Sequence, residues 1–440
     1  MKSVNTINLD GEDYGLEDAQ ARQDANAAMR AAADAVGKVD KIIAGDIEPG
    51  SGTGGGEEGG EGNPKPAGKL YGARWYKTQS LTKLERTLTA EGMTFSPSVG
   101  ASIGRSDFDG VYPWSDCRLC NYANGAVTYY EDEAGFSRSP ASGDVMLEIP
   151  KFYYKIDENS LYRETIISSQ RPGDGPAPEG FHISPRHAPT AGNPSGWDKI
   201  YASAYTLNSS YRSISGNNSI VSIDRPTARA GCRNRGNGYQ LMDYAALGTI
   251  SLLYLVETAD LNSQTAIGPG FTDATNTAQI ATGGANGVAW HSGRASGNAA
   301  AAKNAIKYRH LENLWGNLWQ WIDGINFNNS LIYVNTNPAT YADDVAGSYT
   351  QLSYTKAAAN GYIKALGFDP ALPWAQICTD ATGADGTFVS DHYWQNTAWR
   401  ALLFGGSWSN AGNAGLFCFS SHDAASRVGT TLGCRLLVLP

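Results

Sequence analysis

Phe404-Gly405-Gly406-Ser407-Trp408-Ser409-Asn410 and Gly433-Cys434-Arg435-Leu436 bracket the stretch around which this chain is organised. A Gly-Gly corner and a tryptophan begin it, and an apolar run, residues 436–439, ends it. Residues 413–427 between them keep neither helical nor strand periodicity and mix aromatic, hydroxyl, amide and charged side chains. That composition is typical of a recognition surface. An ordinary surface loop beside a C-terminal strand is the alternative interpretation.

The overall composition limits the class of partner. The 440 residues carry 34 Lys and Arg against 43 Asp and Glu, which gives a net charge of -9. No basic stripe stands out, so we expect no nucleic-acid partner. Only 18% of the residues are charged, whereas Gly, Ser, Thr, Asn and Tyr are abundant. This balance favours a loop-rich extracellular or virion protein over a cytosolic metabolic enzyme.

The first ten residues lack the apolar core of a secretory signal peptide. No window approaches the roughly 20 apolar residues of a membrane span, so we expect no membrane insertion. The longest apolar stretch, residues 250–256, is predicted to be a buried helix or strand. We therefore expect a soluble product made in the cytoplasm, and a virion component released by lysis would need no signal either.

The cysteine pattern does not predict a metal site. Cys117-Arg118-Leu119-Cys120 is a lone C-x-x-C without a second pair or a histidine at zinc-finger spacing. Its flanks read as loop rather than as the strand and helix of a thioredoxin motif. We expect all the cysteines to be reduced and mostly buried: Cys117, Cys120, Cys232, Cys378, Cys418 and Cys434.

The N-terminal part, residues 1–44, is predicted to serve oligomerisation or virion attachment. Residues 12–43 read as one helix, in which apolar positions from Ala25 to Ile43 alternate by four and three and form a short heptad seam. A single helix docked on a partner is the alternative. Residues 45–68 are dominated by Gly, Glu and Pro and are predicted to be a flexible linker. A helical base, a neck and a large distal domain are the plan of an attachment protein.

Residues 69–440 alternate short apolar runs with turn residues, which predicts an α+β domain with a strand majority and long loops. Predicted strands cover residues 145–149, 152–156, 199–205, 331–334 and 435–438. One helix is predicted over residues 239–257, and a weaker one over residues 299–306.

The sequence contains no motif that predicts a catalytic site. The six histidines have no metal-ligand spacing, and neither a P-loop nor a nucleophile elbow is present. Asp343 with Asp344, or Asp385 with Asp391, could pair, but we expect such loop carboxylates to be solvated. We therefore predict no enzyme activity, no cofactor and no metal.

Two landmarks carry a family resemblance. Residues 313–321, Asn-Leu-Trp-Gly-Asn-Leu-Trp-Gln-Trp, lie about 90 positions before Gly405-Gly406-Ser407-Trp408, and Gly433-Cys434-Arg435-Leu436 follows. This order resembles the C-type-lectin-like fold of formylglycine-generating enzymes. The segment Met242-Asp243-Tyr244-Ala245-Ala246 looks like that family's Glu-Trp-Glu-Tyr-Ala-Ala helix, and Glu148-Ile149-Pro150 looks like its opening strand.

A nearer resemblance is to phage receptor-binding tail proteins of this fold, whose surface is diversified by retroelements. It rests on residues 112–114, 149–155 and 312–317, and on residues 13–22, which resemble the start of a tail-fibre stalk. The resemblance implies a homotrimer that contacts other phage tail proteins through its N-terminal helix. It implies a place in the virion, at a tail tip or fibre, and a bacterial surface receptor, protein or glycan, as the partner.

Departures from the enzyme family matter. The active-site cysteine pair that follows Gly-Gly-Ser in those enzymes is missing from residues 409–415, so thiol or copper chemistry is not expected. The calcium-coordinating motifs of sugar-binding lectins are also missing. A formylglycine-generating-type oxidoreductase and a cellular diversified adhesin remain alternative functions, and the absent signal peptide disfavours the adhesin.

The sequence thus predicts a fixed scaffold with a variable binding surface over residues 394–431. The predicted scaffold residues are Trp315, Gly316, Asn317, Trp319, Trp321, Gly405, Gly406, Ser407, Trp408, Gly433 and Arg435. The predicted ligand-binding residues are Trp394, Leu402, Phe404, Ser409, Asn410, Asn413, Phe417, Phe419, Ser421, His422, Asp423, Arg427 and Thr430, with the aromatic residues as anchors. Phe417 and Phe419 share one strand parity, so burial of that face is the alternative.

Overall fold

The computed structural model describes residues 6–9, 12–15, 68–297 and 304–440. The chain divides into two compact units, Met1–Asn63 with Asn159–Leu161, and Pro64–Glu158 with Tyr162–Pro440. Strands far outnumber helices among the described residues, which confirms the predicted strand majority. The lectin-like identity of the fold stays a prediction. None of the described helices combines the length and apolar composition needed to cross a membrane.

A two-stranded antiparallel hairpin, β1 (Thr6–Leu9) and β2 (Glu12–Gly15), lies near the N-terminus. Leu9 pairs with Glu12, so only Asp10 and Gly11 separate the strands. Asp-Gly between two extended runs is one of the strongest hairpin signals in a sequence. The predicted helix over residues 12–43 is therefore wrong at its start. Its remainder, and the predicted linker as far as residue 67, lie outside the described residues.

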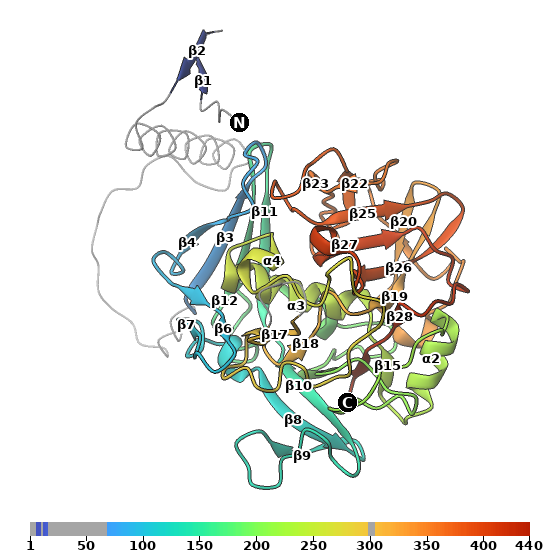
Figure 1. Ribbon diagram of the computed structural model, residues 1–440. Helices are drawn as coiled ribbons and strands as arrows, with labels where there is room; N and C mark the ends of the chain where they lie inside the picture. The colour runs from blue at the N-terminus through green and yellow to red at the C-terminus, as the bar shows by residue number, and fades with distance from the viewer. Residues whose placement is uncertain (1–5, 10–11, 16–67, 298–303) are drawn as a thin grey trace, which may run out of the picture. The chain divides into compact units, whose positions relative to one another are not determined.

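Two antiparallel sheets form the first half of the larger unit (Figure 1). One has the strand order β15-β29-β14-β10-β8-β9 and the other β13-β11-β12-β3-β4. The first comprises β8 (Arg118–Ala123), β9 (Ala126–Tyr130), β10 (Asp144–Pro150), β14 (Lys199–Ser203), β15 (Tyr239–Leu241) and β29 (Leu436–Val438). The second comprises β3 (Leu70–Tyr76), β4 (Glu85–Leu88), β11 (Tyr153–Glu158), β12 (Tyr162–Ser168) and β13 (His182–Ile183). The C-terminal strand β29 thus lies between β14 and β15, two strands that are about 200 or more residues away in the chain.

The described part of the larger unit also contains three small sheets. A four-stranded sheet has the order β18-β17-β16-β6, and two pairs are β23-β24 and β5-β7. Their strands are β5 (Phe95–Ser96), β6 (Ser98–Val99), β7 (Arg105–Ser106), β16 (Gly293–Arg294), β17 (Ile306–Tyr308), β18 (Leu311–Glu312), β23 (Ala365–Leu366) and β24 (Cys378–Asp380). The predicted helix over residues 299–306 is wrong at Ile306, which begins a strand. Residues 299–303 lie outside the described part.

Three α-helices are described: α2 (Arg225–Arg233), α3 (Tyr244–Thr258) and α4 (Ser263–Ala266). Helix α3 is apolar around most of its circumference and is buried at the centre of the larger unit (Figure 1). The predicted helix over residues 239–257 begins too early, because Tyr239–Leu241 pairs as a strand with β29. The Asp243 carboxylate accepts a hydrogen bond from the Ala246 backbone N–H at 2.8 Å and caps the helix there.

An eight-stranded sheet forms the C-terminal half of the unit. Its order is β21-β20-β19-β26-β27-β25-β22, and β28 pairs in parallel with β19. The strands are β19 (Trp319–Asn328), β20 (Leu331–Val334), β21 (Thr350–Gln351), β22 (Gly361–Tyr362), β25 (His392–Gln395), β26 (Trp399–Gly405), β27 (Gly415–Ser421) and β28 (Leu432–Gly433). One face packs on the main core with α3, where the Tyr254 and Phe417 rings lie 6.2 Å apart. The other face carries the candidate site.

The predicted strands over residues 145–149, 152–156, 199–205, 331–334 and 435–438 are confirmed to within two residues at each end. The prediction that the cysteines are mostly buried is also confirmed, since all six thiols are buried and none forms a disulfide. Burial raises the pKa of Cys117, Cys120 and Cys378 to about 12.

Candidate functional site

The two glycine-containing motifs touch through their backbones. The Gly316 N–H donates to the Gly405 carbonyl oxygen at 3.0 Å. A Cβ at Gly405 would lie 2.5 Å from the Leu314 carbonyl oxygen, and its φ of +91° is one that L side chains rarely adopt. At Gly316, with a φ of +74°, an added Cβ would lie 2.7 Å from Thr272 Cγ2 and 2.9 Å from the Phe271 carbonyl oxygen. Glycine is therefore required at both positions, and their contact fixes the start of β19 against the end of β26.

Three of the four tryptophans predicted to be structural are buried. Trp315 and Trp321 are fully enclosed and donate from Nε1 to the carbonyl oxygens of Gly268 and Ile223, at 2.9 and 3.0 Å. Trp408 is also buried. Trp319 is different, because it remains half-buried and faces a cavity on the outer side of the sheet.

Arg435 is the buried tie between this region and the rest of the unit. Its guanidinium is completely enclosed and donates to Gln320 Oε1 at 2.6 Å and to the Ser203 carbonyl oxygen at 2.7 Å, and also to the carbonyl oxygen of Glu312. Burial lowers the pKa of this guanidinium to about 10. The motif that contains Arg435 therefore joins β19, β14 and β18.

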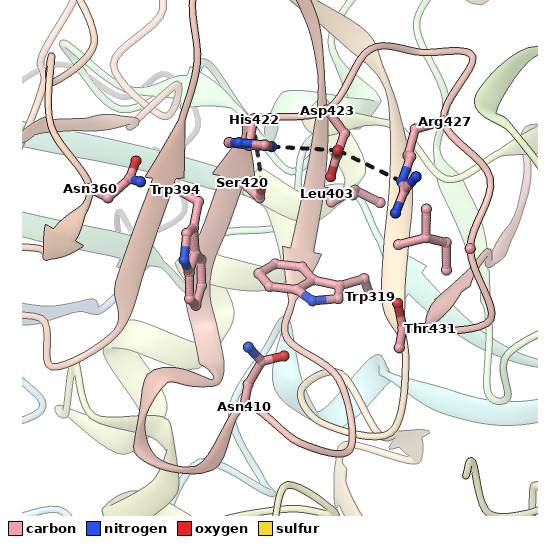
Figure 2. Close-up of a pocket in the computed structure, with 12 residues that line it drawn as sticks. Trp319, Asn360, Trp394, Leu403, Asn410, Ser420, His422, Asp423, Arg427 and Thr431 are labelled. Carbon is pink, nitrogen blue, oxygen red and sulfur yellow. Dashed lines mark hydrogen bonds and ion pairs between the residues drawn. The ribbon is translucent and has the colours of Figure 1, made fainter. Parts of the chain in front are cut away.

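A cavity of about 310 Å³ lies on the outer face of the sheet, and we call it the two-tryptophan pocket (Figure 2). Its lining is Trp319, Asn360, Trp394, Leu403, Asn410, Ser420, His422, Asp423, Arg427, Gly429, Thr431 and Leu432. Strand register explains the hollow. Ser420 pairs with Trp394 on one side and with Leu403 on the other. Leu403 pairs in turn with Trp321 of β19, and Trp319 lies two residues earlier on the same face. The smaller Leu403 and Ser420 therefore leave a depression beside the indoles of Trp319 and Trp394.

The indoles of Trp319 and Trp394 meet edge to face. Their ring centroids are 5.4 Å apart and their planes are inclined by 81°. His392 packs behind Trp394 with a centroid distance of 4.1 Å, and Tyr362 packs in turn against His392 at 5.3 Å. Burial lowers the pKa of His392, which favours its neutral form in this row. The row supports Trp394 from outside the pocket and restricts its rotamer.

The segment of residues 422–431 forms one wall of the pocket, and we call it the rim loop. Its backbone is tied to the fold, because the carbonyl oxygens of residues 423, 425, 429 and 431 accept hydrogen bonds from the N–H groups of residues 401, 225, 222 and 319. Its side chains are much freer. The exposed fractions of the His422, Asp423 and Arg427 side chains are 48%, 30% and 61%. The loop is thus held by main-chain bonds that do not depend on these side chains.

The polar side chains of the rim loop make only long contacts with each other. Asp423 Oδ1 lies 3.5 Å from His422 Nδ1 and 3.9 Å from Arg427 Nε. Figure 2 marks both contacts with dashed lines. Both distances exceed the 2.7–2.9 Å of strong charge-assisted hydrogen bonds. The three side chains are therefore available to a ligand at the mouth of the pocket.

Two amides that line the pocket have a fixed orientation. Asn410 Oδ1 accepts from the Ser407 N–H at 2.7 Å and from Ser407 Oγ at 2.8 Å. Asn360 Oδ1 accepts from the Gln395 N–H at 2.8 Å. These hydrogen bonds fix the orientation of both amides and leave their NH₂ groups as donors for a ligand.

Five of the predicted ligand-binding residues line the pocket together: Trp394, Asn410, His422, Asp423 and Arg427. Three others lie outside its lining. Ser409 and Thr430 are exposed, and Asn413 is half-buried.

The remaining five predicted ligand-binding residues, Leu402, Phe404, Phe417, Phe419 and Ser421, are buried, so direct contact with a ligand is wrong for them. The physical reason is that these side chains lie on the face of β26 and β27 that packs on the core, opposite to the face of Leu403 and Ser420. The four apolar side chains belong to the core with α3. The Ser421 hydroxyl lies 2.6 Å from Tyr393 Oη inside the protein.

Sequence reasoning missed several lining residues. Trp319 was assigned to the scaffold, and Asn360, Leu403, Ser420 and Thr431 were not selected. The alternation along β26 offered a signal, because Leu403 has the opposite parity to Leu402 and Phe404. Asn360 carried no signal, since it comes from a distant loop that only the fold brings to the pocket.

In each acidic pair considered as possible catalytic groups, one carboxylate is exposed, as expected for Asp344 and Asp385, and the other is bound within the fold. Asp343 accepts from Arg225 Nε at 2.6 Å and from Arg229 at 2.7 Å. Asp391 is buried and accepts from the Phe417 N–H at 2.7 Å, and desolvation raises its pKa well above the usual value. These carboxylates stabilise the scaffold. Within residues 68–297 and 304–440 no cluster of three His, Cys, Asp or Glu side chains is placed to hold a metal ion.

Comparisons with known proteins give distant structural similarity only. No family model and no curated protein matches the chain. Among solved structures it is similar to the Major Tropism Determinant U1 and M1 variants. Each has a TM-score of 0.27 and 12% identity, with 73% of this chain and 71% of that chain covered. For the P3c variant of the same protein, the TM-score is 0.26 at 12% identity, with 85% and 73% covered. Similarity at this level does not assign a function.

Proposed function

We propose that this chain is a phage receptor-binding protein that attaches the virion to a bacterial surface receptor through the two-tryptophan pocket. The observation that carries the proposal is the pair of half-buried indoles, Trp319 and Trp394, placed in a concave site with loosely paired polar groups at its mouth. Aromatic anchors surrounded by a polar rim are the usual composition of a binding hot spot. The motif resemblance to phage tail proteins supports the same proposal.

The rim loop suits a surface whose specificity changes. Its main-chain bonds hold the loop, whereas His422, Asp423 and Arg427 point outward and make few contacts with the fold. Substitution of these side chains would therefore alter recognition at little cost in stability. We propose that these positions, together with Asn410, are where a retroelement would diversify the protein. Trimers and several copies on one particle would raise avidity by about 10²–10⁴ over a single weak site.

The enzyme alternative receives less support from the described residues. An oxidoreductase of the formylglycine-generating type needs a reactive thiolate, which requires an accessible, low-pKa cysteine. Cys418 and Cys434 are both buried, and burial raises the pKa of Cys418 well above its usual value. We therefore propose a binding protein and not an enzyme.

The test measures binding of the full-length protein, labelled with a fluorophore, to a panel of bacterial strains. We expect saturable binding to at least one strain and its loss in Trp394→Ala. The matched control is Trp399→Ala, which removes a half-buried indole from neighbouring strand β26 outside the pocket lining. Binding that is equally weakened by both variants, or absent from every strain, would contradict the proposal.

A further inference from the structure

The size of the two-tryptophan pocket restricts its occupant. A cavity of about 310 Å³ lies at the lower end of the range for sites that enclose small ligands. A protein epitope instead covers about 800 Å² of each partner, and a cavity of this kind is not required for it. The pocket therefore fits one ring-sized group, such as the end of a longer molecule.

The chemistry of the walls selects the kind of ring. An aromatic face is electron-rich, so it attracts C–H bonds that carry partial positive charge, as those of a sugar ring do. Trp319 and Trp394 provide two indoles at nearly a right angle, so a ring in the pocket meets the face of one and the edge of the other. A saturated ring with C–H groups on its faces and hydroxyls at its edge fits this corner.

Polar groups around that corner have complementary roles. In Figure 2, Asn360 lies beside Trp394 and Asn410 lies below the two indoles, and their oriented NH₂ groups are donors, whereas the Asp423 carboxylate on the rim loop is an acceptor. A hydroxyl both donates and accepts, so vicinal hydroxyls can satisfy both kinds of group at once. The two oxygens of one carboxylate can bind two neighbouring hydroxyls, and such bonds to charged groups are the stronger ones.

Charge at the pocket mouth disfavours ionic occupants. Arg427 and Asp423 lie on the same rim, with Arg427 Nε 3.9 Å from Asp423 Oδ1. A cation would meet the repulsion of Arg427, and an anion would meet that of Asp423, so neither gains the unopposed charge that a dedicated ionic site supplies. A neutral group avoids both penalties.

We infer that the pocket binds a neutral pyranose ring of a bacterial surface glycan through Trp319, Trp394, Asn360, Asn410 and Asp423, without a metal ion. This inference rests on the proposed function, because it names the chemical class of the receptor. A single ring held in this way binds weakly, and strong attachment would come from several sites on one particle.

The deciding experiment uses the strain that binds the full-length protein. Cells are treated with periodate, which cleaves the vicinal diols of sugar rings, or in parallel with a protease. We expect periodate to reduce binding of the wild-type chain and of Trp399→Ala at least tenfold. This loss is expected whether or not protease treatment also reduces binding. Binding that survives periodate would overturn the glycan inference and leave the receptor-binding proposal standing. If no strain binds, the proposed function itself fails, and the inference fails with it.

A second measurement locates the sugar in the pocket. Surface polysaccharide purified from the same strain is titrated into the full-length protein, and tryptophan fluorescence is followed with and without EDTA. We expect a saturable change that EDTA does not alter and that Trp394→Ala removes. Asp423→Asn and Asn410→Ala should each weaken the apparent affinity about tenfold, which corresponds to the loss of one good hydrogen bond. A titration in which Asp423→Asn and Asn410→Ala match the wild type, or one abolished by EDTA, would contradict the assignment.

Discussion

Trp319 and Trp394 lie edge to face at a centroid distance of 5.4 Å, although strands β26 and β27 separate their strands in the sheet. Both indoles line the same pocket as Leu403 and Ser420, which lie on the two middle strands and pair with each other. The two-tryptophan pocket thus combines large and small side chains from four strands.

Replacement of Trp394 by Ala should abolish cell binding and reduce stability only modestly. The indole is half-buried and packs on Trp319 and His392, so we expect a loss of about 1–2 kcal/mol in the free energy of unfolding. Urea denaturation measures this loss, and Trp399→Ala serves as the matched control for the removal of an indole. A loss above about 4 kcal/mol would show that Trp394 belongs to the scaffold.

Simultaneous replacement of His422, Asp423 and Arg427 by Ala should abolish attachment while thermal unfolding stays nearly unchanged. Their mutual contacts are long and exposed, and exposed ion pairs contribute about 0.2–1 kcal/mol. We expect the melting temperature to fall by less than about 4 °C. Calorimetry and the cell-binding assay are run on the same preparation. A large fall in melting temperature would mean that the rim loop needs these side chains to fold.

Gly405→Ala should be strongly destabilising, because the added Cβ meets the Leu314 carbonyl oxygen and the residue has a φ of +91°. We expect a loss of at least about 2 kcal/mol. Gly92→Ala is the control, since Gly92 has a φ of +76° but no neighbouring atom within 4 Å of the added carbon. The difference between the two variants in urea denaturation measures the cost of the close approach. Equal losses would show that the contact with Leu314 is unimportant.

The sequence predicted the scaffold better than the surface, for a physical reason. Gly405, Gly433 and the buried tryptophans belong to local motifs whose conformational demands are visible in the chain itself. Phe417 and Phe419 could not be assigned to core or surface from parity alone. Only the packing of this face of β27 on α3 shows that both rings are buried. Asn360 joins the pocket through the tertiary fold, which periodicity does not describe.

Tertiary pairing that local patterns do not describe also explains the error at the start of the predicted helix over residues 239–257. Asp243 is a strong N-cap residue, yet the apolar run before it reads equally well as helix or strand. Pairing of Tyr239–Leu241 with β29 makes this segment a strand, and that partner is almost 200 residues away in the chain. In contrast, the Asp10-Gly11 turn signal was local and was overlooked in favour of the heptad pattern that follows it.

His187 should make stability fall as the pH is lowered. Its ring is fully buried, with Nε2 3.1 Å from the Ile149 carbonyl oxygen and Nδ1 2.7 Å from Ser184 Oγ. Desolvation lowers the pKa of His187 to about 3 in the folded protein, whereas the unfolded chain binds the proton near the ordinary pKa of about 6.5. Between these two values the unfolded state therefore holds more protons, and the folded state loses stability as pH decreases.

The expected size of this effect is up to about 1.4 kcal/mol per pH unit between pH 6.5 and 3. His187→Gln removes the titrating group, so its free energy of unfolding should fall less steeply over that range. Burial also lowers the pKa of His291, His310 and His392, but these residues are present in both proteins and cancel in the difference. His182→Gln replaces an exposed histidine and is the matched control for the substitution. If His187→Gln and the wild type lose stability in parallel from pH 7 to pH 4, His187 does not remain neutral in the folded protein.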